Sequence, residues 1–247
     1  RRVLFRSKIS SAALEQFIPE MKIFGMPYLF KDNDHKWKVL NGPVGKDILD
    51  ACQKRGLIGL GYYEAGSRSF YTKNTPIRTP EDLKNLKIRV MKSPIAIELL
   101  KTLGASPTPI SWGELYTALQ QGTVDGAENN PPSFVSARHY EVCKYYSLDK
   151  HSSPLDVVLF SKSTWKKLSD KNKKLIKDTF QESVKYQRKL WAEVVEDNFA
   201  TLDSVGVEVI EPDLSKFREK VRPIYNKYSS EPVFGKYIKK IRNIDMD

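Results

Sequence analysis

The sequence predicts an α/β protein, and three observations support that prediction. Short apolar, often β-branched runs alternate with well-capped helical segments, a pattern typical of parallel strands joined by right-handed helical crossovers. The 247-residue chain is long enough for one large domain or two smaller lobes. Residues 169–205 contain neither glycine nor proline and read as a helix longer than one small lobe.

The strand and helix around residue 90 show how each element is delimited. "KIRVM" (87–91) reads as a short buried strand. Ser93 then reads as a helix N-cap, Pro94 suits the first helical turn, and Gly104 is a typical C-terminal stop. The same reasoning predicts further strands at 57–63 and 125–129 and helices at 79–86, 93–104 and 111–122.

The segment 169–205 has apolar residues at roughly helical spacing along its length. At 1.5 Å per residue, such a helix would be about 50 Å long. The segment is compatible with two helices and an unmarked break, or with one helix that spans two lobes. We favour the single helix because no residue in the segment is a helix breaker.

The first seven residues, RRVLFRS, resemble the translation of a sequencing adapter rather than part of a gene. The alternative is a genuine basic leader. We expect residues 1–7 to be a leader foreign to the native protein, whose true start would lie upstream. The missing signal peptide then says nothing about the compartment in which the protein works.

Charge and hydropathy narrow the function classes. The formal net charge is +11, and the lysines are interspersed with Asp and Glu along the helical segments. No arginine-rich arm or aromatic-basic motif is present, so we do not expect nucleic-acid binding, whereas an anionic small ligand suits the charge. No apolar run approaches the roughly 20 residues that a membrane-spanning helix needs.

Enzymatic and metal chemistry find little support. There is no G-x-S-x-G motif, no glycine-rich phosphate loop after a strand, and no H-E-x-x-H spacing. We therefore expect no catalytic residues, metal or cofactor, and we read His35, His139 and His151 as surface or capping residues. Cys52 and Cys143 lie far apart in the sequence, which favours two buried free thiols over a disulfide or a metal site.

Arg89 breaks the predicted burial pattern. It lies between Ile88 and Val90 in an otherwise apolar strand, and burying an unpaired charge costs several kcal/mol. Ligands of open α/β sheets bind outside the carboxyl ends of the strands, where a guanidinium can hold a carboxylate with two parallel hydrogen bonds. A pair with an Asp or Glu of the protein is equally compatible with the strand alone.

Two longer motifs point to a family. "PIRTPEDLKNLKIRV" (76–90) and "GASPTPISWGELYTALQQGTVDGAENNPPS" (104–133) closely resemble the two signatures of the DctP family, the solute-binding proteins of TRAP transporters. The resemblance covers about residues 8–230 and departs from the family pattern at Asn85, where glycine is usual, and at Met91. It also implies that the first strands of the N-terminal lobe, with ligand contacts of their own, precede this chain.

The resemblance implies a two-lobed periplasmic binding protein fold, in which a cleft between two α/β lobes closes on an organic acid and a long helix spans both lobes. The implied boundaries are 8–63 for the truncated N-terminal lobe, 64–154 for the second lobe, 155–195 for the return to the N-terminal lobe and the first part of the long helix, and 196–247 for the end of that helix and a C-terminal segment on the second lobe. It further implies a monomeric periplasmic receptor that delivers its ligand to the small and large permease subunits of a TRAP transporter.

The resemblance also assigns ligand-binding residues. Arg89 matches the arginine that forms a salt bridge with the ligand carboxylate. Arg68, in "AGSRSFY", matches the second arginine of the site, and Asn129, in "GAENN", matches the asparagine that binds the same end of the ligand. Trp112 falls where the family often has an aromatic residue in the pocket, although ordinary core packing explains it equally well.

Tyr63 and Glu64 precede Arg68 at the predicted crossing between the lobes. A carboxylate near the arginines would repel a dicarboxylate but accept hydrogen bonds from hydroxyls, so Glu64 favours a hydroxylated monoacid. The combination "YYEAGSRSFY…AENN" resembles the sugar-acid-binding members of the family and points to a ligand such as a uronate. Two other functions stay open: the ligand-sensing domain of a signalling system, and an α/β enzyme that acts on organic acids.

Overall fold

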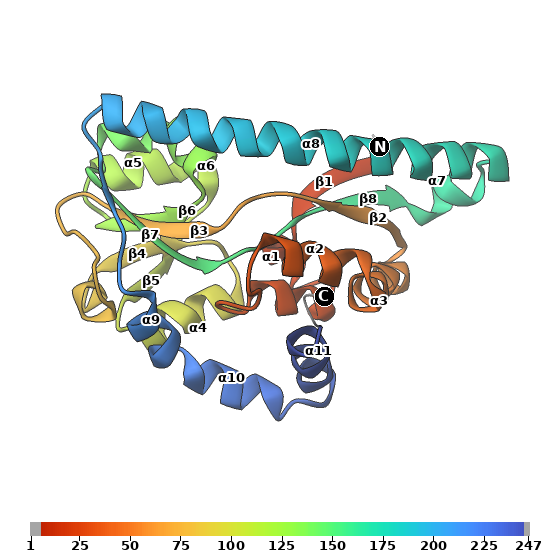
Figure 1. Cartoon of the computed structure of the whole chain (residues 1–247), viewed down its shortest axis with the longest axis horizontal. Coiled ribbons are helices and arrows are strands. Elements are labelled where there is room, and N and C mark those ends of the chain that lie inside the picture. The colour runs from red at the N-terminus through yellow and green to blue at the C-terminus, as the bar shows by residue number, and fades with distance from the viewer. Residues whose placement is uncertain (1–5, 245–247) are drawn as a thin grey trace.

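The computed structural model describes residues 6–244, which form two lobes built on two sheets (Figure 1). Lobe 1 contains three strands in the spatial order β1 (Arg6–Ser10), β8 (Asp156–Ser161) and β2 (Leu57–Tyr63). The six strands of lobe 2 are, in spatial order, β5 (Ser106–Pro109), β4 (Lys87–Val90), β6 (Gly126–Asn129), β3 (Arg68–Thr72), β7 (Tyr145–Ser152) and β9 (Glu208–Ile210). The α/β architecture agrees with the prediction.

Strand direction differs from the prediction in part of the molecule. β4 runs parallel to β5 and β6, and β7 runs parallel to β9, as predicted. β3 is antiparallel to both of its neighbours, and the described strands of lobe 1 are antiparallel throughout. The reason is that β3 enters lobe 2 from β2 at the edge where β4 and β6 end, so it runs in the opposite direction. β8 likewise enters lobe 1 at the edge from which β2 leaves.

Short helices cover both sheets. Those of lobe 1 are α1 (Ser11–Leu14), η1 (Pro19–Gly25), α2 (Asn33–Asn41), α3 (Pro43–Ala51), η2 (Cys52–Arg55) and α7 (Lys162–Lys166). Those of lobe 2 are η3 (Pro80–Leu83), α4 (Pro94–Leu103), η4 (Trp112–Glu114), α5 (Leu115–Gln120), α6 (Pro131–Ser136) and η5 (His139–Glu141). The caps of α4 are as predicted, since Ser93 Oγ accepts from Ala96 N at 3.2 Å and Gly104 adopts φ 99°.

The long segment forms one helix, α8 (Asp170–Ser204), of 35 residues. The side chain of Ser169 caps its first turn. Phe180 packs against Tyr63 of β2 in lobe 1, with ring centroids 5.3 Å apart, whereas Leu202 is buried in a separate hydrophobic cluster in lobe 2. α8 therefore spans both lobes, as Figure 1 shows along the top of the view, and the single-helix prediction is confirmed.

The C-terminal segment crosses back between the lobes. α9 (Leu214–Lys220) and α10 (Arg222–Ser229) pack against α4 in lobe 2, whereas α11 (Pro232–Arg242) packs against η1 and α3 in lobe 1. All of 196–247 was expected on lobe 2, and α11 departs from that expectation. Its buried side chains Phe234, Ile238 and Ile241 follow a helical spacing that fits one apolar face turned to lobe 1.

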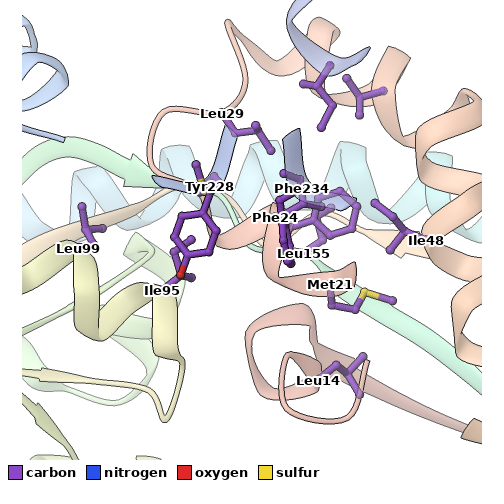
Figure 2. Packing of buried hydrophobic residues seen from close by; sticks show 14 of the residues in the cluster. Leu14, Met21, Phe24, Leu29, Ile48, Ile95, Leu99, Leu155, Tyr228 and Phe234 are labelled. Atoms are coloured by element: carbon purple, nitrogen blue, oxygen red, sulfur yellow. The ribbon is translucent and has the colours of Figure 1, made fainter. Parts of the chain in front are cut away.

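The main hydrophobic core is continuous across the two lobes. Figure 2 shows Tyr228 of α10 between Leu99 of α4 and Phe24 of η1, and Tyr228 Oη also donates to Glu98 at 2.9 Å. A second cluster fills lobe 2 between its sheet and the helices α5, α6 and α8. The C-terminal helices thus fasten one lobe to the other.

The N-terminal boundary of the folded part differs from the expected one. Residues 1–5 of the expected leader lie outside the described residues, but Arg6 and Ser7 belong to β1 and pair with Phe160 and Leu159, so the boundary expected at residue 8 is not a structural one.

Asn85, where the family usually has glycine, adopts the left-handed φ of 67°. Asparagine tolerates this conformation better than other side chains, which explains how the departure is accommodated.

The cysteine prediction is confirmed, whereas the prediction that the histidines lie at the surface is wrong; His35 does bond a last-turn carbonyl of α11, as a capping residue would. Cys52 and Cys143 are buried free thiols, and burial raises their pKa values to about 11 and about 12. His35, His139 and His151 are all buried, each with at most 1% of its surface exposed. Their ring nitrogens have hydrogen-bond partners inside the protein, which the sequence alone did not reveal.

Two absences apply to residues 6–244. None of the helices in this range is both long enough and apolar enough to cross a membrane. No group of three or more His, Cys, Asp or Glu side chains in the same range is placed to hold a metal ion.

Candidate functional site

Three of the predicted ligand-binding residues lie at the edge of the lobe 2 sheet that faces lobe 1. β4 and β6 end at this edge and β3 begins there, so strand direction brings Arg89, Asn129 and Arg68 close together. In register, Arg89 lies opposite Ala127, two residues before Asn129, and Asn129 lies opposite Ser69. The edge thus collects side chains that are 61 residues apart at most in the sequence.

Arg68 is buried, and its guanidinium is held by the protein itself. Nε and Nη2 donate to the carboxylate of Glu128, with Nη2 at 2.9 Å from Oε1, and Nη2 also donates to the Glu128 carbonyl at 2.6 Å. Nη1 donates to Asn129 Oδ1 at 2.8 Å. Burial alone would lower the pKa of Arg68, but the charge and hydrogen bonds of Glu128 outweigh it and raise that pKa. Arg68 is therefore already paired.

Glu128 begins a buried row of charges that no sequence motif indicated. Its carboxylate also lies 3.5 Å from Nε2 of His151, whose Nδ1 is 2.7 Å from Oδ2 of Asp149. Asp149 Oδ1 accepts from the backbone N–H of Phe70 at 2.9 Å, and the rings of Phe70 and His151 stack with centroids 4.4 Å apart. Arg68, Glu128, His151 and Asp149 thus form one row of alternating charge.

The two central groups of this row of charges, Glu128 and His151, have pKa values far from the ordinary ones. Burial alone would raise the pKa of Glu128, but Arg68 and His151 outweigh it and lower the pKa to about 2. Burial alone would lower the pKa of His151, but Asp149 and Glu128 outweigh it and raise the pKa to about 9, so His151 is charged at neutral pH. The sequence signal that could have revealed it is the i, i+2 spacing of Asp149 and His151, which places both side chains on one face of a strand.

Arg89 lies near these four charged residues but forms no ion pair with any of them. Only 3% of its surface is exposed; Nε donates to the Ile110 carbonyl at 2.8 Å, and Nη1 is buried without a hydrogen-bond partner. Among residues 6–244, no Asp or Glu oxygen lies within 4.0 Å of its guanidinium nitrogens. Burial lowers the pKa of Arg89; Glu128 opposes this shift and Arg68 adds to it. The alternative reading, a pair with a protein carboxylate, is not what the structure shows.

The charges at this edge do not balance. Arg68, Arg89 and His151 are cations, whereas Glu128 and Asp149 are the carboxylates that face them. Among these five groups one positive charge is left over, and the contacts assign it to Arg89. Glu15 of lobe 1 also reaches this junction, but it bonds Ser93 and lines a cavity with Arg68 and His151 rather than pairing with Arg89. Because a buried cation without a counter-ion is costly, the edge is suited to a ligand that brings one carboxylate.

Trp112 lies against Arg89 and remains partly exposed. Arg89 Cζ is 5.7 Å from the centroid of the Trp112 ring, and 44% of the Trp112 surface is exposed. The ring also lies 5.2 Å from that of His139, where burial and the Arg89 charge lower the pKa to about 4. His139 therefore adds no charge at neutral pH. Trp112 is therefore not a core residue, and its ring lies beside the Arg89 guanidinium.

Asn129 connects Arg68 to the start of α6. Its Oδ1 accepts from Arg68 Nη1 and from the backbone N–H of Asn130 at 2.9 Å, which leaves Nδ2 as the group that can donate to a ligand. Asn130 caps α6 by accepting from Ser133 N at 2.8 Å, and its own Nδ2 donates to the Ala65 carbonyl at 2.8 Å. Asn130 therefore holds Ala65, in the segment that joins β2 to β3, against lobe 2.

Lobe 1 contributes Glu15, which no sequence motif indicated either. Only 3% of Glu15 is exposed; Oε2 accepts from Ser93 Oγ at 2.8 Å, at the start of α4, while Oε1 is buried without a partner. Burial raises the pKa of Glu15 to about 7. A cavity of about 20 Å³ between the lobes is lined in part by Glu15, Arg68 and His151. Glu15 is thus the ionisable group of lobe 1 in contact with this junction.

Glu64 is occupied by contacts away from the arginines. Oε1 accepts from Lys36 Nζ at 2.7 Å and Oε2 from Trp37 Nε1 at 3.2 Å. Oε1 also accepts from the backbone N–H groups of Ala65 at 3.1 Å and Gly66 at 2.8 Å. We call residues 64–67, which join β2 to β3, the strap. Glu64 fixes the strap to α2, and its contacts do not extend to Arg89.

Tyr63 contacts the long helix. Its hydroxyl lies 2.8 Å from Ser183 Oγ, and its ring centroid is 5.3 Å from that of Phe180. Next along the chain, the side-chain amide of Gln187 bonds both the backbone N–H and the carbonyl of Glu64, each at 2.9 Å. The structure therefore brings Arg89, Arg68, Asn129 and Trp112 together, whereas the contacts of Tyr63 and Glu64 hold the strap in place.

Comparison with known proteins identifies the family. The model of the DctP family, described as bacterial extracellular solute-binding protein, family 7, matches residues 7–231. The chain belongs to this family. Because the relatives are solute-binding proteins, the chain is a binding protein rather than an enzyme.

One relative and two solved structures illustrate the likeness. The 2,3-diketo-L-gulonate-binding periplasmic protein YiaO of Escherichia coli is 39% identical over 193 residues, which cover 78% of this chain and 58% of that protein. A TRAP periplasmic solute-binding protein from Xanthobacter autotrophicus with bound β-D-galacturonate is 39% identical, with a TM-score of 0.93 over 98% of this chain and 81% of that chain. One from Roseobacter denitrificans with bound β-D-glucuronate is 33% identical, with a TM-score of 0.94 over 98% and 81%.

These likenesses confirm the two-lobed fold and the TRAP solute-binding family. The chain spans between 58% and 72% of the length of eight curated relatives that it matches.

Proposed function

We propose that this chain captures a sugar acid, a hexuronate such as D-galacturonate or D-glucuronate, by its carboxylate and delivers it to the membrane subunits of a TRAP transporter. The observation that carries the proposal is Arg89, a buried guanidinium whose Nη1 has no partner and with which no carboxylate of the described residues forms a salt bridge. A ligand carboxylate would supply both the missing acceptor and the missing charge.

The neighbouring residues have separate roles in this proposal. Arg89 forms the salt bridge, Asn129 donates from Nδ2 to the same end of the ligand, and Trp112 covers that end from the solvent side. Arg68 does not contact the ligand itself; its hydrogen bonds orient Asn129 and Glu128. Tyr63 and Glu64 act on the strap, so we do not place them in contact with the ligand.

A monocarboxylate with hydroxyls fits this edge better than a dicarboxylate. Arg68 and His151 are already paired with Glu128 and Asp149, and Glu15 lies on the same side, so a second ligand carboxylate would find no free cation there. From the sequence, the expectation of a monocarboxylate rested on Glu64, but in the structure Glu64 forms a salt bridge with Lys36. The support now comes from the charge balance and from two solved relatives that hold uronates.

Calorimetric titration of D-galacturonate into wild type, Arg89→Ala and Arg89→Lys tests the salt bridge. Removing one partner of a buried ion pair costs about 3–5 kcal/mol, so Arg89→Ala should weaken binding by about two to four decades. Lysine keeps the charge but not the planar fork, so Arg89→Lys should recover only part of the loss. Arg222→Ala, an exposed arginine on α10, is the control and should bind as wild type does.

Two results would count against the proposal in different ways. Affinity of Arg89→Ala within about threefold of wild type would rule out the salt bridge. Binding of succinate or malate by wild type, with no binding of either uronate, would keep the carboxylate site but overturn the sugar-acid assignment.

We further propose that the protein works as a monomer in the periplasm with the small and large TRAP permease subunits. The support is the family, described as extracellular, and its periplasmic relatives. Labelled galacturonate should enter proteoliposomes that hold the permease subunits encoded beside this gene only when this protein is added. Uptake that is equally fast without the protein would contradict the delivery role, and a dimer in sedimentation analysis would contradict the monomer.

A further inference from the structure

A second pocket, of about 770 Å³, lies between α8, the strap, lobe 2 and the start of α2 in lobe 1. Its lining includes Gly66 and Ser67 of the strap, but none of Arg68, Arg89 or Asn129. A cavity of this volume falls in the range of small-molecule sites. The proposed sugar-acid site does not use it.

The pocket has an apolar floor and wall. The apolar side chains come from β7, α6 and α8: Tyr146, Leu148, Pro131, Trp191, Val195 and Phe199. Trp191 lies against the strap, because a Cβ on Gly66 would come within 3.1 Å of Trp191 Nε1. The indole thus forms a fixed aromatic face next to a strap that Gln187 also ties to the helix.

The rim of the pocket is cationic. Lys150 of β7 and Lys185 of α8 are exposed lining residues, and neither forms an ion pair within residues 6–244. Arg188 also lines the pocket, with its Cζ 4.3 Å from the centroid of the Trp37 ring. The acidic residue in the lining is Glu64, which Lys36 neutralises. The rim therefore carries surplus positive charge next to an apolar surface.

We propose that this pocket is a second ligand site, which binds an aromatic organic anion, such as an aromatic carboxylate or sulfonate. The rings would lie against Trp191 and Phe199, and the acid group would lie near Lys150 and Lys185. Aromatic stacking and apolar burial supply the attraction for the body of the ligand, and the lysines supply the attraction for its charge. A hexuronate lacks an apolar body and does not fit this chemistry.

Fluorescence titration with 8-anilinonaphthalene-1-sulfonate, an aromatic sulfonate, tests the site on the whole chain at saturating D-galacturonate. We expect one dye per chain and weaker binding as ionic strength rises. Lys150→Gln/Lys185→Gln should weaken dye binding about tenfold, because it removes both unpaired charges. Ala192→Trp, which places a bulky ring in the pocket lining, should abolish binding.

Three controls separate this site from others. Lys171→Gln/Lys220→Gln removes the same charge from exposed positions outside the pocket and should bind the dye as wild type does. Arg89→Ala should also bind the dye normally, even though the proposed function predicts that it loses galacturonate. Retained galacturonate binding by the two pocket variants shows that they are folded.

Several outcomes would overturn the second site. One is unchanged dye affinity in Lys150→Gln/Lys185→Gln or in Ala192→Trp. Another is an equal loss in the Lys171→Gln/Lys220→Gln control. Displacement of the dye by galacturonate, or loss of dye binding in Arg89→Ala, would place the dye in the sugar-acid site instead.

Discussion

Arg68 of β3 and Arg89 of β4 lie at the same edge of the lobe 2 sheet. Both are buried, but their hydrogen-bond partners differ. Arg68 bonds the carboxylate and carbonyl of Glu128 and the side chain of Asn129. Arg89 bonds one backbone carbonyl and leaves Nη1 unpartnered. The pKa of Arg68 is raised and that of Arg89 is lowered.

The difference separates a structural arginine from a ligand-binding one. The charge of Arg68 is balanced by the fold, so losing Arg68 should disturb the fold. The charge of Arg89 is not balanced by the fold, so losing Arg89 should disturb ligand binding. Burial alone does not distinguish the two residues, whereas the count of partners does.

The largest expected effect on stability comes from Arg68→Ala. The substitution leaves the Glu128 carboxylate buried beside only His151, so the free energy of unfolding without ligand should fall by about 3–5 kcal/mol. Chemical unfolding of wild type and variant measures the change. A loss below about 1 kcal/mol would mean that Arg68 is not the structural partner of Glu128.

Glu15 should make stability fall as pH rises. Its folded pKa, about 7, lies above the ordinary value of 4.5, so between these values the folded state binds a proton that the unfolded state releases. Over that window the contribution of Glu15 to stability should fall by about 3 kcal/mol. Unfolding free energies of wild type and Glu15→Gln across pH 4.5–7 measure it. Parallel curves for the two proteins would show that Glu15 does not titrate in this window.

His151 should titrate far above the ordinary range of histidine. Its folded pKa is raised from 6.5 to about 9, so its stabilising contribution is complete below pH 6.5 and is lost as pH rises through 9. Asp149→Asn removes one of the two carboxylates and should lower the pKa of His151 by at least about one unit. NMR titration of the imidazole gives both values. A His151 signal that titrates near 6.5 in wild type would contradict the buried row of charges.

The smallest expected effect is that of Arg89→Met on the protein without ligand. Replacing an unpaired buried charge with an apolar side chain of similar length should leave the unfolding free energy unchanged or raise it by about 1 kcal/mol. Thermal unfolding of wild type and variant, each without ligand, checks this. A marked fall in the melting temperature would mean that Arg89 has a protein partner after all.

The sequence predicted the family and the strand positions well because those features depend on local patterns. β2 was placed at its observed bounds, and Ser93 and Gly104 were recognised as the caps of α4. The 35-residue α8 followed from the absence of helix breakers. The direction of β3 could not be read locally, because it depends on how the chain crosses between the lobes.

The site was predictable only where a motif carried it. Arg89, Arg68 and Asn129 lie in recognisable motifs, and the structure brings them together. Glu128, His151 and Glu15 were missed, because their importance comes from contacts with residues far along the chain. Glu64 was placed near the arginines from its position before Arg68, but the strap turns its side chain to Lys36 and Trp37.

The most direct test of the role of Arg89 compares two ligands that differ at one carbon. D-galacturonate and D-galactose share their ring hydroxyls and differ in whether that carbon is a carboxylate. Competitive calorimetry of both ligands with wild type and with Arg89→Ala gives the preference for the carboxylate in each protein. We predict that wild type prefers galacturonate by about two decades or more and that Arg89→Ala loses most of this preference. The same preference in both proteins would contradict the claim that Arg89 holds the ligand carboxylate.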